Sequence, residues 1–77
     1  MNLIQLDLQT QPGGAETYAA FCCRAFAELG IKTRLLIHPH AHFWSEMSLG
    51  AGTECVPVSD PAEELLRPRD TPTWFLI

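Results

Sequence analysis

The chain has 77 residues, of which 47% are hydrophobic and 18% are charged, and its formal net charge is −4 at pH 7. This length accommodates one domain at most and excludes a large two-domain enzyme, while the composition is that of a globular domain and not of a disordered chain. The five basic residues form no continuous stripe. A nucleic-acid surface is therefore not expected, because binding to the phosphate backbone requires a basic patch.

The chain shows no signal for export or for insertion into a membrane. The first residues lack a basic n-region, and Asp7 interrupts the apolar run that follows. No stretch approaches the roughly 18 apolar residues of a membrane span. The cysteines Cys22, Cys23 and Cys55 occur without a Cys-x-x-Cys spacing and are expected to be reduced thiols that pack as small apolar side chains. The sequence therefore predicts a cytoplasmic protein without a membrane span.

The first half of the chain has the pattern of a strand, a helix and a second strand. Residues 3–8 form a short, nearly continuous apolar run, which is typical of a buried parallel strand. Over residues 15–29 apolar side chains recur at the helical period, and Gly30 follows as a C-terminal stop. Residues 33–37 predict a second strand, parallel to the first through a right-handed crossover.

The helix is expected to lie on the sheet through its more regular apolar face. That face comprises Ala15, Tyr18, Ala19, Cys22, Ala25, Phe26 and Leu29. The other face carries Ala20, Phe21, Cys23 and Ala27. Since this second face is more apolar than a fully exposed helix face should be, we expect another element to cover part of it.

A short helix and an edge strand are expected in the middle of the chain. Residues 41–49 predict one to two helical turns with apolar side chains directed inward, among them Phe43, Met47 and Trp44. The next strand is predicted over residues 54–58. Its proline indicates an edge or bulged position, because proline cannot donate a sheet hydrogen bond.

The end of the chain predicts a capped helix and a last strand. Asp60 stands at the N-cap, Pro61 at the first helical position and Glu63 three residues after the cap. Residues 73–77 form an apolar run typical of a central strand, so we expect the chain to be the front of something larger. The order β-α-β-α-β-α-β predicts an α/β fold, a Rossmann-like three-layer half-domain with a parallel sheet in the order 3-2-1-4.

The segment between the first strand and the helix carries the strongest functional signal. Gly13 and Gly14 lead into the helix, where orphan backbone N–H groups and the positive end of the helix dipole favour an anion. This loop follows the carboxyl end of a strand, which is where α/β sheets bind ligands. The spacing is neither a dinucleotide fingerprint nor a Walker loop. The segment predicts a phosphate or nucleotide site, and the alternative is a tight turn without a ligand.

Three segments taken together carry a family resemblance: Gly13-Gly14-Ala15-Glu16, the helix end Glu28-Leu29-Gly30 and the run Lys32-Thr33-Arg34-Leu35-Leu36. They resemble the N-terminal domain of retaining GT-B glycosyltransferases of the family-four type. The resemblance implies two Rossmann-like domains across a cleft, with the acceptor held by the N-terminal domain and the nucleotide-sugar donor by the C-terminal domain. It also implies that Gly13 and Gly14 approach the donor's phosphates, and that Glu16 organises the loop or the helix start.

On this resemblance, residues 1–77 are a partial acceptor-side domain, and the C-terminal donor domain is absent. The family depends on that second domain to stabilise the leaving diphosphate, which needs cationic or dipolar groups as charge develops. We therefore expect little or no transferase activity from the chain alone. Its catalytic residues are not assigned.

His38, His40 and His42 form a second cluster after the second strand. Alternate residues of an extended chain share one face, so three imidazoles can converge on a metal ion, although Pro39 disturbs the alternation. The retaining mechanism implied by the resemblance needs no such metal, and neither a metal nor a cofactor is expected. The histidines are interpreted as acceptor-side hydrogen-bonding groups or as solvated loop residues. Asp7 is interpreted as a cleft carboxylate or as a strand-end cap.

The sequence leaves three functions open. The favoured one is the N-terminal portion of a glycosyltransferase that moves a sugar from a nucleotide-sugar donor to an unidentified acceptor. The first alternative is a small non-catalytic module that binds a phosphorylated ligand through Gly13 and Gly14. The second is a metal-binding protein built on the three histidines.

Overall fold

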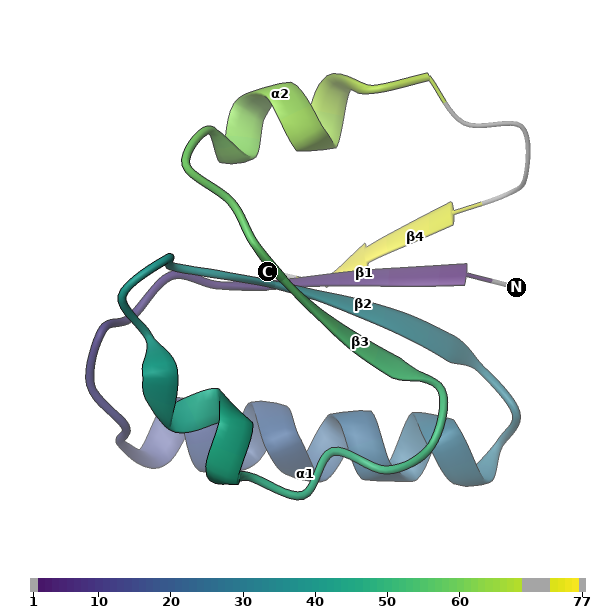
Figure 1. Ribbon diagram of the computed structural model, residues 1–77. Coiled ribbons are helices and arrows are strands. Elements are labelled where there is room, and N and C mark those ends of the chain that lie inside the picture. The colour runs from purple at the N-terminus through teal and green to yellow at the C-terminus, as the bar shows by residue number, and fades with distance from the viewer. Residues whose placement is uncertain (1, 69–72, 77) are drawn as a thin grey trace.

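A four-stranded parallel sheet organises the chain in the computed structural model, which describes residues 2–68 and 73–76 (Figure 1). The strands are β1 (Asn2–Asp7), β2 (Lys32–Ile37), β3 (Thr53–Pro57) and β4 (Thr73–Leu76), and their order is β3-β2-β1-β4. Helix α1 (Gly14–Glu28) and the 3-10 helix η1 (His42–Glu46) cover one face, and α2 (Pro61–Leu66) covers the other. The predicted parallel pairing and strand order are confirmed, and Ile77, predicted to end the last strand, lies outside the described residues.

The core lies between the sheet, α1 and η1. Its buried members are Ala19, Ala20, Cys23, Leu35, Ile37, Ala41 and Trp44. Trp44 is 2% exposed, and Phe43 and Met47 pack against the cluster from partly buried positions. The inward direction predicted for these side chains is confirmed; Phe43 and Trp44 lie in the short 3-10 helix η1, and Met47 directly follows it.

Helix α1 faces the sheet with small residues and not with its larger apolar ones. Its buried residues are Glu16, Ala19, Ala20 and Cys23. Tyr18 is 68% exposed and Leu29 is 73% exposed, so the prediction that these side chains pack on the sheet is wrong. Small side chains let the helix lie close to the strands, and the Cys23 thiol donates to Gln5 Oε1 of β1 at 3.5 Å.

Helix α1 ends just before Gly30, as the sequence predicts. Gly30 has a φ of +75°, a left-handed conformation that glycine adopts without a steric penalty. The N–H of Ile31 donates to the Phe26 carbonyl at 2.9 Å, and the N–H of Gly30 donates to the Ala27 carbonyl at 3.1 Å. This pair of bonds is a Schellman motif, which satisfies carbonyls that the helix leaves without partners.

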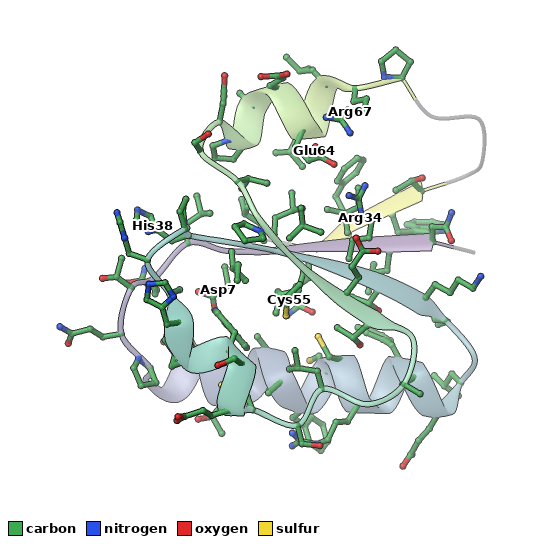
Figure 2. All side chains as sticks on the ribbon, in the orientation of Figure 1. Asp7, Arg34, His38, Cys55, Glu64 and Arg67 are labelled. Atoms are coloured by element: carbon green, nitrogen blue, oxygen red, sulfur yellow. The ribbon has the colours of Figure 1, made fainter. Side chains whose placement is uncertain are left out.

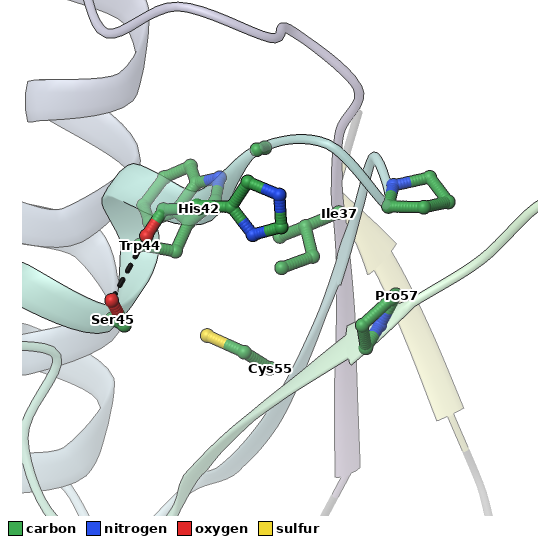
Figure 3. A pocket seen from close by; sticks show the side chains of 8 residues that line it. Ile37, His42, Trp44, Ser45, Cys55 and Pro57 are labelled. Atoms are coloured by element: carbon green, nitrogen blue, oxygen red, sulfur yellow. Dashed lines mark hydrogen bonds between the residues drawn. The ribbon is translucent and has the colours of Figure 1, made fainter.

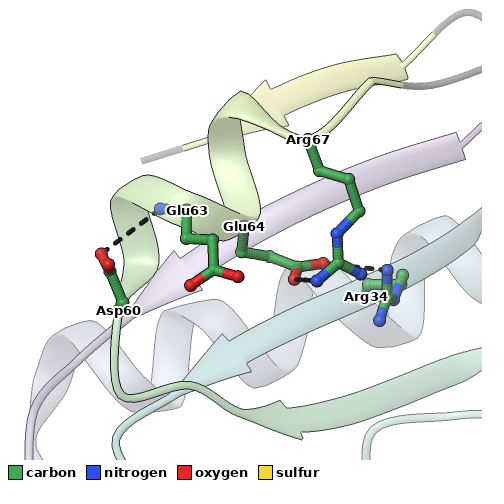
Figure 4. Close-up of polar contacts among 5 residues, drawn as sticks. All are labelled: Arg34, Asp60, Glu63, Glu64 and Arg67. Carbon is green, nitrogen blue, oxygen red and sulfur yellow. Dashed lines mark hydrogen bonds and ion pairs between the residues drawn. The ribbon is translucent and has the colours of Figure 1, made fainter.

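Helix α2 is capped and is tied to the sheet by an ion cluster (Figure 4). The Glu63 N–H donates to Asp60 Oδ1 at 3.3 Å, which confirms the predicted N-cap. Glu64 is 6% exposed. Its carboxylate lies 3.1 Å from Arg34 Nη1 of β2 and 3.0 Å from Arg67 Nη2. The cluster therefore links α2 to the face of the sheet opposite α1.

The two outer strands of the described sheet differ in character. Strand β3 ends on Pro57 at one edge, as the proline predicts. Strand β4 lies at the other edge, and its Trp74 and Phe75 are 62% and 46% exposed. Within residues 2–68 and 73–76, no helix has the length and apolar character that crossing a bilayer requires.

Candidate functional site at the carboxyl edge of the sheet

The carboxyl ends of β1, β2 and β3 meet at one edge of the sheet, because the strands run parallel. Three loops leave this edge, over residues 8–13, 38–41 and 58–60. Asp7 and His38 both lie at this edge (Figure 2). Ligands of open α/β sheets bind outside the carboxyl ends of the strands, so this edge is the candidate functional site.

Gly13 and Gly14 form the entrance to α1, as predicted. Gly13 is the N-cap residue, no side chain caps the helix there, and its carbonyl accepts from the Thr17 N–H at 3.1 Å. A Cβ added at Gly14 would meet no heavy atom of the described chain within 4 Å. Residues 11–15 are exposed. The turn and the first two residues of α1 therefore lie at the surface, whereas Glu16, the third residue of the helix, is buried.

Glu16 lies behind this entrance and is 3% exposed. Its Oε1 is 3.3 Å from the position that a Cβ on Gly13 would take. The pKa of the Glu16 carboxyl is raised, chiefly by a hydrogen bond with the Asp7 side chain and also by burial and by the negative charge of Asp7. Its Oε2 is buried and has no hydrogen-bond partner among the described residues.

Asp7 also closes the end of β1. Its Oδ1 accepts from the Gln9 N–H at 3.1 Å, which is the strand-end capping role that the sequence offers for this residue. The same side chain faces Glu16, so the two acidic residues belong to one local structure. No local sequence pattern predicts this interaction, because Asp7 lies in β1 and Glu16 in α1.

His38 and His40 lie in the loop after β2, and His42 is the first residue of η1. The ring centroids of His38 and His40 are 5.4 Å apart, and those of His40 and His42 are 6.4 Å apart. The His40 N–H donates to His38 Nδ1 at 3.0 Å, so that nitrogen is already engaged as an acceptor. Among the described residues, no group of three or more His, Cys, Asp or Glu side chains is arranged to hold a metal ion.

The histidines line two different cavities at this edge, His38 and His40 the first and His42 the second. The first has a volume of about 360 Å³ and lies near the start of α2. It is lined by Leu8, His38, Pro39, His40, Val58, Ser59 and Pro61. Because its residues follow β1, β2 and β3, it brings together side chains that are far apart in the sequence. The sequence pattern marks two of them, His38 and His40, whereas no local signal marks Ser59.

The second cavity has a volume of about 250 Å³ and lies between η1 and the edge strand β3 (Figure 3). His42 and Cys55 approach it from opposite sides. Ser45 lines it as well, and its hydroxyl donates to the His42 carbonyl at 2.9 Å. The remaining lining residues are apolar, so this cavity offers a surface for a nonpolar group. Gly13 and Gly14 line neither cavity.

Comparison with known proteins finds no relative of this chain. No protein-family model matches the chain, and no curated protein or solved structure shows significant similarity to it.

Proposed function

We propose that this chain is the acceptor-side N-terminal portion of a retaining glycosyltransferase, in which Gly13 and Gly14 approach the phosphates of a nucleotide-sugar donor. One observation carries the proposal. A 15-residue helix starts at the carboxyl edge of a parallel sheet, directly after a glycine, without a side-chain cap and with open space over its first residue. A helix start of this kind presents N–H groups and a positive dipole end to an anion.

The chemistry of sugar transfer gives this helix start a role. As the bond between sugar and diphosphate breaks, negative charge develops on the leaving phosphate oxygen, and fixed N–H dipoles stabilise it. The absence of a side chain at Gly14 allows a phosphate oxygen to reach these N–H groups. One helix start supplies part of the required stabilisation, and a second domain would supply the rest.

The acceptor would occupy the cavity lined by His38 and His40. Its volume of about 360 Å³ suits a small polar molecule, and imidazole nitrogens can donate to or accept from its hydroxyl groups. His38 Nδ1 is engaged by the His40 N–H, which leaves its Nε2 for the acceptor.

The proposal is tested by titrating the ¹⁵N-labelled chain with uridine diphosphate, with pyrophosphate and with uridine. We expect the amide signals of Gly13, Gly14 and Ala15 to shift with both phosphorylated compounds and not with uridine. Stronger binding of the nucleotide than of pyrophosphate supports a nucleotide-sugar site. Equal binding of the two favours the alternative of a general phosphate-binding module. A folded spectrum in which none of these signals moves contradicts both.

A further inference from the structure

We infer that the cavity between η1 and β3 binds a small, uncharged, nonpolar ring that carries a hydrogen-bond acceptor. The proposed sugar transfer does not use this cavity, because Gly13 and Gly14 do not line it and the sugar acceptor is assigned to the other cavity. The inference therefore stands without the helix start of α1.

The floor of the cavity is fixed by the packing of the core. Ile37, Ala41 and Trp44 line it, and these residues are 7%, 2% and 2% exposed. The backbone around them is held by hydrogen bonds. The Ala41 N–H donates to the His38 carbonyl at 2.9 Å, and the Met47 N–H donates to the Trp44 carbonyl at 3.2 Å. A preformed site of this kind loses little conformational entropy when it binds a ligand.

Strand β3 supplies the opposite wall. In the parallel pairing of β2 and β3, Ile37 lies beside Pro57, and the Val58 N–H donates to the Ile37 carbonyl at 3.0 Å. Cys55 and Pro57 occupy alternate positions of β3 and therefore share one face of the sheet. Figure 3 shows Cys55 and His42 on opposite sides of the cavity. The cavity is thus enclosed by β2, η1 and β3 together.

The size and the lining of the cavity select the class of ligand. Its volume is about 250 Å³, whereas an apolar cavity of about 150 Å³ holds benzene. A substituted ring therefore has room. Among the described residues, no Asp, Glu, Lys or Arg side chain lines this cavity. A charged ligand would lose its hydration there without gaining a permanently charged partner, so the ligand is uncharged.

The indole of Trp44 adds a polar requirement. Its Nε1–H is buried and has no hydrogen-bond partner among the described residues, whereas the Ser45 hydroxyl already donates to the His42 carbonyl at 2.9 Å. A buried donor without a partner costs free energy, which an acceptor on the ligand recovers. The neighbouring His42 is exposed, and exposed side chains change rotamer rapidly, so the acceptor can gain access at this point. A ring with a carbonyl group therefore fits better than a plain hydrocarbon.

The inference is tested by titrating the ¹⁵N-labelled chain with acetophenone, ethylbenzene and benzoate. Acetophenone is an uncharged ring with a carbonyl group, ethylbenzene has nearly the same size without an acceptor, and benzoate carries a charge. We expect the indole N–H signal of Trp44 to move with acetophenone, while that of Trp74, which is 62% exposed, stays in place. Ethylbenzene should bind about three- to tenfold more weakly, because it leaves the N–H without a partner. Benzoate should leave both signals in place.

Cys55→Phe tests the location of the site. The larger side chain extends from β3 into the cavity and should abolish the binding of acetophenone. Cys22→Phe is the matched control, since Cys22 is also half-buried but lies on α1 and lines neither cavity. It should bind acetophenone like the parent chain. If Cys55→Phe does not fold, the comparison of the three compounds on the parent chain decides alone.

Several results would overturn the inference. Equal binding of acetophenone and ethylbenzene would remove the role of the Trp44 N–H, and equal binding of benzoate would contradict the uncharged class. Equal movement of the Trp44 and Trp74 signals would indicate association without a site. No movement of Trp44 with any compound would show that the cavity holds water only. None of these results affects the proposed function, which is tested by the amide signals of residues 13–15.

Discussion

Replacing Gly14 with alanine separates the two roles that a glycine turn can have. If the turn itself requires glycine, the substitution destabilises the fold; if the glycine serves a ligand, the fold tolerates it. The structure favours the second outcome. A Cβ at Gly14 meets nothing within 4 Å, and the positive φ values among the described glycines belong to Gly30, Gly50 and Gly52.

The expected gain in stability follows from helix propensity. Alanine is favoured over glycine by about 0.8–1.0 kcal/mol inside a helix, and by less at the first position, so we expect the free energy of unfolding to rise by about 0.5 kcal/mol. For a domain of this size that corresponds to an increase in Tm of about 2–4 °C. Thermal unfolding followed by far-ultraviolet circular dichroism measures it.

The added methyl group should at the same time weaken sulfate binding. It occupies the space in front of the first N–H groups of α1, and the loss of one hydrogen bond to a charged group costs about 1.5 kcal/mol or more, which is about tenfold in the dissociation constant. Gly30→Ala is the matched control. Its φ of +75° penalises alanine by about 1–2 kcal/mol, and its sulfate affinity should match that of the parent. A lower Tm for Gly14→Ala, or an unchanged sulfate affinity, would refute the reasoning.

Three further predictions concern the core, the ion cluster and the thiols. Trp44→Ala empties a core position that is 2% exposed and should cost about 3–5 kcal/mol in urea denaturation, whereas Trp44→Phe should cost clearly less; equal losses would contradict a packing role. Glu64→Ala removes a nearly buried carboxylate from two partly exposed arginines and should cost about 1–2 kcal/mol, with a smaller loss in 1 M salt; a stability equal to the parent would show the cluster to be neutral. Burial raises the pKa of the Cys23 thiol to about 11 and also raises that of Cys55, so a disulfide reagent at pH 8 should modify Cys22 first; rapid labelling of Cys23 in the folded chain would contradict its burial.

The arrangement of strands and the helix ends were predictable because their signals act over a few residues. Gly30 and Asp60 each complete hydrogen bonds within one helical turn, and the structure contains those bonds. The face of α1 was not predictable in the same way, because the helix has two apolar stripes. The helical period favours the stripe that contains Tyr18 and Leu29. The helix approaches the sheet most closely, however, through its small alanine and cysteine side chains. Helical period alone contains no information on that distance.

Only the part of the candidate site that lies within one continuous segment of the sequence was predictable. The position of Gly13 and Gly14 at the carboxyl edge follows from the strand, turn and helix pattern. The contact between Asp7 and Glu16 joins two elements, and it can be inferred only when the buried face of α1 is known. The division of the histidines between two cavities depends on the path of the chain after β2 and on residues that follow β3.

The position of β1 in the sheet has a consequence for the rate of folding. Asn2 pairs with Lys32 on one side and with Thr73 on the other, so the first strand of the chain lies between two partners that come much later. Each described pairing is parallel, and none of them joins neighbouring segments through a hairpin. Two distant segments must therefore come together before each pair of strands can form its hydrogen bonds. The loop that must close to bring β4 to β1 contains most of the protein. Folding of this small chain should be slow for its length, with the joining of β1 and β2 across α1 as its earliest productive event.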